Sequence, residues 1–143
     1  MSESDPGAVV GALTSRFAGL RLWAVHSSPA PGSAPEDIGP HLVEHLRHII
    51  GWERHGVLFA GGPYLDDDGN PGDSALYLLR ADSEAAATAL AAEEPLHQHG
   101  VRVFSVRPWQ LNQGRFAVHI DISHQTGGID GTPAPLDLEG SNR

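Results

Sequence analysis

The sequence predicts an α+β domain in which two helices cover one face of an antiparallel sheet. Segments that alternate apolar and polar residues at the strand period are interleaved with two segments of helical periodicity. These segments follow the order β-α-β-β-α-β, with an extra strand toward the C-terminus. A length of 143 residues and an apolar fraction of 40% allow one domain with one hydrophobic core.

The first part of the chain predicts an extension, a strand and an irregular connection. Residues 1–19 are expected to be an N-terminal extension with a short helix near residues 9–17. Residues 20–26 mix apolar and aromatic side chains, which is typical of a strand. Residues 27–40 contain four prolines and predict an irregular connection that runs into a helix.

The central part predicts a helix and a buried strand. Apolar residues recur at three- and four-residue spacing over residues 40–55, which indicates an amphipathic helix, and Gly56 follows its end. Residues 57–60 are expected to form a strand that ends at the Gly-Gly-Pro run of residues 61–63. Residues 64–74 are rich in Asp, Gly and Pro and predict a turn.

The remaining strands and the second helix follow in order. Residues 75–80 predict a strand, and residues 83–92 an alanine-rich helix that Ser83 caps and Pro95 ends. Residues 101–109 alternate as a half-buried strand does. Residues 116–122 alternate in the same way and predict the extra C-terminal strand.

The predicted arrangement is ferredoxin-like. A single domain is expected over residues 20–123, and residues 124–143 are expected to be a flexible tail because they offer little to bury. Helices on one face leave the other face of the sheet bare. Two copies paired through that face would form a dimeric α+β barrel, so a homodimer is expected.

Composition excludes several classes of function. The formal charge of −9 opposes nucleic-acid binding. The absence of cysteine excludes disulfides and thiolate chemistry. No stretch is apolar and long enough for a membrane span, and residues 1–11 lack the features of a signal peptide. A cytoplasmic protein is therefore expected.

Several short strings, in this order and spacing, resemble the YCII-related (YciI-like) family of small dimeric α+β barrel proteins. The resemblance covers roughly residues 20–109. It rests on His45-Leu46, the run Val-Leu-Phe-Ala-Gly-Gly-Pro at residues 57–63, Ala-Asp-Ser at residues 81–83, Glu94-Pro95, and Arg-Pro-Trp at residues 107–109.

The resemblance implies an active site made of a histidine on the first helix and an acidic residue at the end of the second. Spacing to Gly56 assigns the histidine to His45. The acidic residue, usually the aspartate of an Asp-Pro pair, corresponds to Glu94, which keeps the charge but adds one methylene. The candidate catalytic residues are therefore His45 and Glu94.

The helical pattern supports His45 independently. At about 100° per residue the apolar stripe is centred near Leu46, so His45 lies at its edge, where a polar side chain can reach a pocket rim. A histidine there can act as general acid or base, because the side chain exchanges protons near neutral pH. A structural role at the helix surface is the alternative.

Four further residues are candidates for substrate binding. Trp52 lies on the same flank of the helix as His45. Gly62 and Pro63 can shape a pocket wall, although a strand terminator explains them equally well. His97 follows Pro95 and can face the same pocket as Glu94, or lie in an exposed polar loop.

No metal or other cofactor is expected. His41, His45 and His48 project to one side of the helix, but the H-E-x-x-H pattern is absent and a solvated face explains them. Asp66, Asp67 and Asp68 lack the distal glutamate of a calcium loop.

The expected function is a cofactor-independent lyase or isomerase. It would use proton transfer or elimination on a small cyclic, aromatic or enol-type metabolite, since barrels of this kind are similar to muconolactone isomerase. The alternative is a non-catalytic dimeric protein that binds a small molecule or serves as an accessory subunit.

Overall fold

The computed structural model describes residues 5–135 and divides into two compact units, residues 1–111 and 112–143. These limits differ from the expected extension at 1–19, domain at 20–123 and tail at 124–143. Residues 1–4 and 136–143, which belong to the expected extension and tail, lie outside the described residues.

The first unit contains the expected β-α-β-β-α-β order with three short additions. Its elements are α1 (Pro6–Thr14), β1 (Leu20–Pro29), the 3₁₀ helix η1 (Pro35–His41), α2 (Leu42–Arg54), β2 (Leu58–Leu65), β3 (Pro71–Leu79), α3 (Glu84–Glu93), α4 (Pro95–Gln98) and β4 (Arg102–Leu111). No helix in the described part of the chain is long and apolar enough to cross a membrane.

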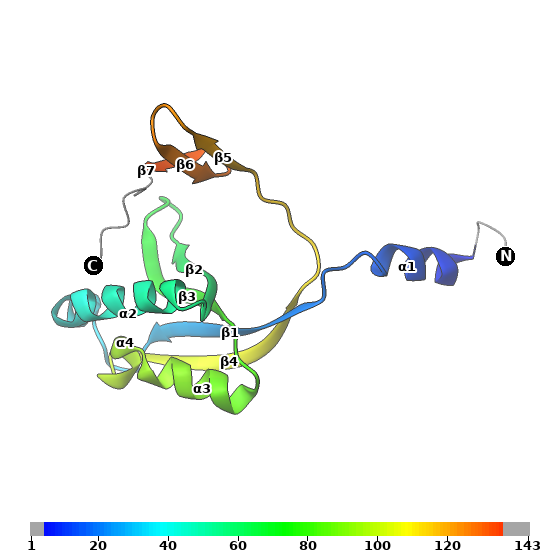
Figure 1. The fold of residues 1–143 in the computed structure, drawn as a ribbon. Helices are drawn as coiled ribbons and strands as arrows, with labels where there is room; N and C mark the ends of the chain where they lie inside the picture. Colours follow the sequence, from blue (N-terminus) through cyan, green and yellow to red (C-terminus); the bar gives the residue numbers. More distant parts are fainter. Residues whose placement is uncertain (1–4, 136–143) are drawn as a thin grey trace. The chain divides into compact units, whose positions relative to one another are not determined.

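The main sheet has four antiparallel strands in the order β2-β3-β1-β4 (Figure 1). The central strand β1 places Val25 opposite Tyr77 of β3 and opposite Val106 of β4. Because side chains alternate between the faces of a strand, these three residues share one face.

The hydrophobic core lies between this face and the helices. Val25, Tyr77 and Leu79 are buried with Trp52 of α2 and Ala91 of α3. Ala91 is fully buried, and its small side chain lets α3 approach the strands closely. The two main helices therefore pack against the same face of the sheet, as the sequence predicts.

Two boundaries differ from the sequence prediction near the prolines. Strand β1 continues to Pro29, and η1 occupies much of the segment expected to be irregular. The Gly-Gly-Pro run does not end β2, which continues to Leu65. Since β2 is an edge strand, Pro63 can lie in it without removing a hydrogen bond from the sheet interior.

The second unit is a separate three-stranded sheet of β5 (Val118–Asp121), β6 (Thr126–Ile129) and β7 (Thr132–Pro135). The strand expected at residues 116–122 is present as β5, but it pairs with β6 and does not join the main sheet. A hairpin joins β6 and β7, with Asp130 and Gly131 both at positive φ. An Asp-Gly pair is a strong hairpin signal that the sequence interpretation overlooked.

Candidate active site

Helix α2 positions His45 at the edge of the core. Ile49 and Trp52, four and seven residues further along, lie on the same side of the helix and pack into the core. His45 shares this side near the start of α2, and its side chain is 13% exposed. The amphipathic pattern thus directs His45 inward, toward the strands and α4.

Glu94 stands at the junction of α3 and α4. Proline restricts the preceding residue to extended backbone, and Glu94 has φ −63° and ψ 127°, which ends α3. Its Oε1 accepts a hydrogen bond from the backbone N–H of Leu96 at 3.1 Å and so caps α4. The Glu-Pro pair therefore fixes a fully buried carboxylate in place.

His45 and Glu94 form a hydrogen bond, with 2.5 Å between His45 Nδ1 and Glu94 Oε1. An ionised carboxylate can only accept, so Nδ1 carries the proton and donates it. The second ring nitrogen, Nε2, then presents a lone pair and makes no hydrogen bond within the described residues. The side chain of Glu94, one methylene longer than an aspartate, thus still forms the hydrogen bond with His45.

The environment keeps Glu94 ionised. Burial, the largest influence, would raise the pKa of Glu94. The hydrogen bonds from His45 and Leu96, with a smaller effect of the positive charge that the rings of His45 and His97 carry when protonated, outweigh it and lower the pKa below its ordinary value. A buried carboxylate is tolerated when it is hydrogen-bonded in this way.

His97 lies behind this pair. Its Nδ1 donates to the carbonyl oxygen of Ala91 at 2.7 Å, and its Nε2 accepts from the Ser27 hydroxyl at 2.8 Å. Burial lowers the pKa of His97 more than Ala91 and Glu94 raise it. Nδ1 is 3.6 Å from Glu94 Oε2, an oxygen without a hydrogen-bond partner among the described residues. His97 is thus a neutral support beside Glu94.

A cavity of about 400 Å³ opens next to His45. Elements η1, α2, β2, β3, α4 and β4 contribute to its wall. The apolar side chains in the wall include Ile38, Leu42, Leu46, Ile49 and Leu96, and the polar ones are His45, Tyr77 and Arg102. Gly62 and Pro63 also line the cavity, where the sequence prediction placed them.

The other two predicted binding residues lie elsewhere. Trp52 is 6% exposed, belongs to the core and does not line this cavity. Its ring meets the rings of His48 and Tyr77 edge-on. His97 is in α4, not in an exposed loop, and its side chain is 2% exposed. Trp52 lies in the core because a large aromatic ring on the core-facing side of a helix is stabilised more by packing than by exposure at a pocket rim.

Sequence reasoning missed two polar residues of the cavity wall, Tyr77 and Arg102. Burial, together with the nearby charge of Glu94, raises the pKa of Tyr77 to about 12, so the hydroxyl stays protonated. Arg102 is 9% exposed. A signal for Arg102 exists in the sequence: it shares the inward parity of β4 with Phe104 and Val106, where a charge is unusual.

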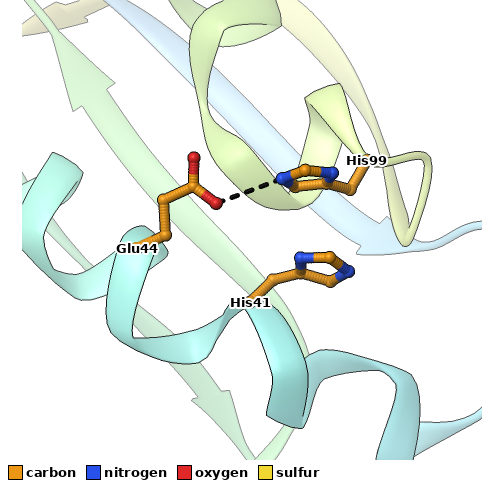
Figure 2. Close-up of side chains that lie close together, drawn as sticks. All are labelled: His41, Glu44 and His99. Atoms are coloured by element: carbon orange, nitrogen blue, oxygen red, sulfur yellow. Dashed lines mark hydrogen bonds and ion pairs between the residues drawn. The ribbon is translucent and has the colours of Figure 1, made fainter.

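The three histidines that the sequence places on one side of the helix, His41, His45 and His48, have different surroundings. His45 contacts Glu94, and His48 packs against Trp52. Within residues 5–135, the possible metal ligands that come together are His41, Glu44 and His99, with their ligand atoms within 4.8 Å of one another. Figure 2 shows a hydrogen-bonded ion pair between Glu44 and His99 beside the ring of His41.

This exposed cluster is arranged as an ion pair and a ring stack. His99 Nε2 is 3.1 Å from Glu44 Oε2, and the rings of His41 and His99 stack with centroids 4.0 Å apart.

Comparisons with known proteins give a family and a similar fold. The sequence model of the family described as YCII-related domain matches residues 22–110. No curated protein sequence matches the chain. A solved structure of similar fold is 5-chloro-2-hydroxyhydroquinone dehydrochlorinase from Burkholderia phenoliruptrix, in complex with 2,5-dihydroxybenzoquinone. It is 17% identical, with 65% of this chain and 95% of that chain covered and a TM-score of 0.50.

Proposed function

Because the chain belongs to the YCII-related domain family, we propose that it is a cofactor-independent lyase or isomerase that uses acid/base chemistry. Its substrate is a small cyclic, aromatic or enol-type metabolite. The observation that carries this proposal is the hydrogen bond between His45 Nδ1 and the buried Glu94, which leaves Nε2 without a hydrogen-bond partner among the described residues. His45 lines a largely apolar cavity. The similar fold of a dehydrochlorinase supports the lyase class.

In this proposal His45 is the catalytic residue and Glu94 is a positioning residue. His45 Nε2 removes a proton from a carbon or hydroxyl of the bound substrate. The positive charge that develops on the ring is stabilised by Glu94, which holds the proton on Nδ1 through the 2.5 Å hydrogen bond. Since Glu94 is fixed as the cap of α4, the ring is oriented before the substrate arrives.

Two outcomes can follow the first proton transfer. If the electron pair forms a double bond and expels a leaving group such as chloride, the reaction is an elimination and His45 passes its proton to solvent. If no group leaves, His45 returns the proton to another atom and the substrate is isomerised. Both need only a positioned base and a sheltered pocket.

Replacement of the catalytic histidine tests the assignment. We expect His45→Gln to lower turnover by roughly 10²- to 10⁴-fold, because a general acid/base contributes that much. Chloride release from 5-chloro-2-hydroxyhydroquinone, the compound named for the similar structure, is the first assay, followed by other cyclic enols. Thermal stability should change little.

The matched control is His55→Gln, which alters an exposed histidine just past the same helix. It should leave turnover at the wild-type level. Turnover retained by His45→Gln would contradict the assignment. A wild-type protein that binds these compounds without converting them would instead support the alternative, a non-catalytic binding protein.

We also propose that two copies pair through the sheet face opposite the helices, as a dimeric α+β barrel would. Val103 and Trp109 of β4 lie on that face, and they are 45% and 42% exposed. Leu76 and Leu78 of β3 share the face and are only half-buried. Exposed apolar side chains on a sheet are stabilised when a second copy covers them.

A further inference from the structure

The cavity wall contains a buried positive charge without an ionic partner. Arg102 is 9% exposed, and its Nε is buried with no hydrogen-bond partner among the described residues. The ion pairs found in the described part of the chain join histidines to Glu94 and Glu44, and none includes Arg102. An arginine in this setting lacks the interactions that normally compensate burial.

The position of Arg102 explains what such a charge can do. It begins β4, on the strand face that also carries Phe104 and Val106, and its side chain lines the cavity that His45 lines. Tyr77, whose protonated hydroxyl can donate a hydrogen bond, lines it too. The polar groups in the wall are thus a cation, a donor and the proton acceptor His45.

We propose that Arg102 binds an anionic oxygen of the substrate and so selects small organic anions with an apolar body. The substrate is either a carboxylate or an ionised enol, since both present the same charged oxygen to a guanidinium. This extends the proposed function by naming the substrate class. The apolar wall strengthens the ion pair, because a low local dielectric weakens screening.

Arg102 also has a role in orientation. A guanidinium can form two parallel hydrogen bonds with one carboxylate, which fixes both the place and the direction of the bound molecule. With its charged end held at β4, the apolar body of the substrate extends along the cavity toward α2. A carbon or hydroxyl of that body is then presented to His45 Nε2.

Binding of matched anionic and neutral probes to the full chain tests the proposal. Benzoate is compared with benzamide, and the enolate of cyclohexane-1,3-dione with its neutral methyl enol ether, by calorimetry at pH 7.5. We expect each anion to bind roughly ten-fold or more tightly than its neutral counterpart, as a charge-assisted hydrogen bond predicts. The stronger of the two anions identifies the oxygen class.

Three variants complete the experiment. Arg102→Met should abolish the preference for anions, and Arg102→Lys should retain part of it. Arg54→Met, which alters an exposed arginine at the end of α2, should leave the preference unchanged. Because Arg102→Met removes an uncompensated buried charge, its melting temperature in the absence of ligand should be no lower than that of the wild type. Benzoate should raise the melting temperature of the wild type and not of this variant.

The proposal is overturned if the neutral probes bind the wild type as tightly as the anions, or if Arg102→Met binds anions like the wild type. If Arg102→Met does not fold, the comparison of anions with neutral probes on the wild type still decides. Failure of the enzyme assignment is distinguishable, because anion binding is measured without turnover. His45→Gln should still bind benzoate.

Discussion

His97 shows how burial assigns a protonation state to a single side chain. Burial lowers the pKa of its ring, so the ring is neutral, with Nδ1 donating to the carbonyl oxygen of Ala91 and Nε2 accepting from the Ser27 hydroxyl. A second proton would place a positive charge in the core, where burial disfavours it. This cost makes the stability of the fold depend on pH.

We predict that His97→Gln lowers the free energy of unfolding by about 1–3 kcal/mol above pH 6.5, where two buried hydrogen bonds are lost. Burial lowers the pKa of His97 in the folded protein below its ordinary value of 6.5. Below pH 6.5 the unfolded chain therefore binds a proton that the folded protein does not, and the wild type loses stability as the pH falls.

The variant has no such group at this position, so the free-energy difference between wild type and His97→Gln should shrink as the pH falls below 6.5. Urea unfolding at several pH values between 5 and 8 measures it. Glu94 affects stability in a different pH range. Its lowered pKa stabilises the folded protein above pH 4.5, and this stabilisation is lost as the pH falls through the pKa of Glu94 in the folded protein. A difference that is constant with pH would contradict the neutral assignment of His97.

At the scale of elements, the pairing of β2 with β3 depends on one of two adjacent glycines. Gly61 lies opposite Tyr77, and a Cβ added at Gly61 would come within 2.9 Å of the Tyr77 ring. A Cβ at Gly62 would meet nothing within 4 Å. The ring of Tyr77 is held in the core and cannot move away.

We therefore predict that Gly61→Ala lowers the free energy of unfolding by about 1–3 kcal/mol through overpacking. The neighbouring Gly62→Ala is the matched control and should change the free energy by less than about 0.5 kcal/mol. Chemical denaturation of both variants measures the two effects. Equal destabilisation by both would show that strand flexibility, and not contact with Tyr77, accounts for the glycines.

The sequence predicted those helices and strands in which apolar residues recur at a clear helical or strand period. The stripe of α2, the Ser83 cap of α3 and the alternation of β4 all correspond to local rules, and Ser83 Oγ accepts from the Ala86 N–H at 3.1 Å. The pattern also selected His45. It could not predict the 2.5 Å contact with Glu94, because that contact joins residues 49 positions apart and depends on how α2 and α4 pack.

The polar residues of the cavity wall were harder to predict than the pair of His45 and Glu94. Tyr77 and Arg102 stand in strands whose inward faces are otherwise apolar, so a reading by hydrophobic pattern treats them as exceptions. Only pairing across the sheet shows that they share a face with Val25. The second sheet was missed for a different reason: its strands are short and rich in glycine, and their signal is the Asp130-Gly131 turn.

At the scale of the whole molecule, the proposed pairing of two copies depends on the sheet face that carries Val103 and Trp109. A stable interface buries about 800 Å² per partner and excludes charge from its centre. We predict that wild-type protein sediments as a dimer, and that Val103→Lys raises the dissociation constant roughly ten-fold or more, because the lysine would lose its hydration in the interface. Val43→Lys alters an exposed valine of α2 and should leave the dimer intact. Analytical ultracentrifugation over a concentration series measures all three proteins. A monomeric wild type would contradict the proposed pairing. Equal dissociation by both variants would show that the interface lies outside this sheet face.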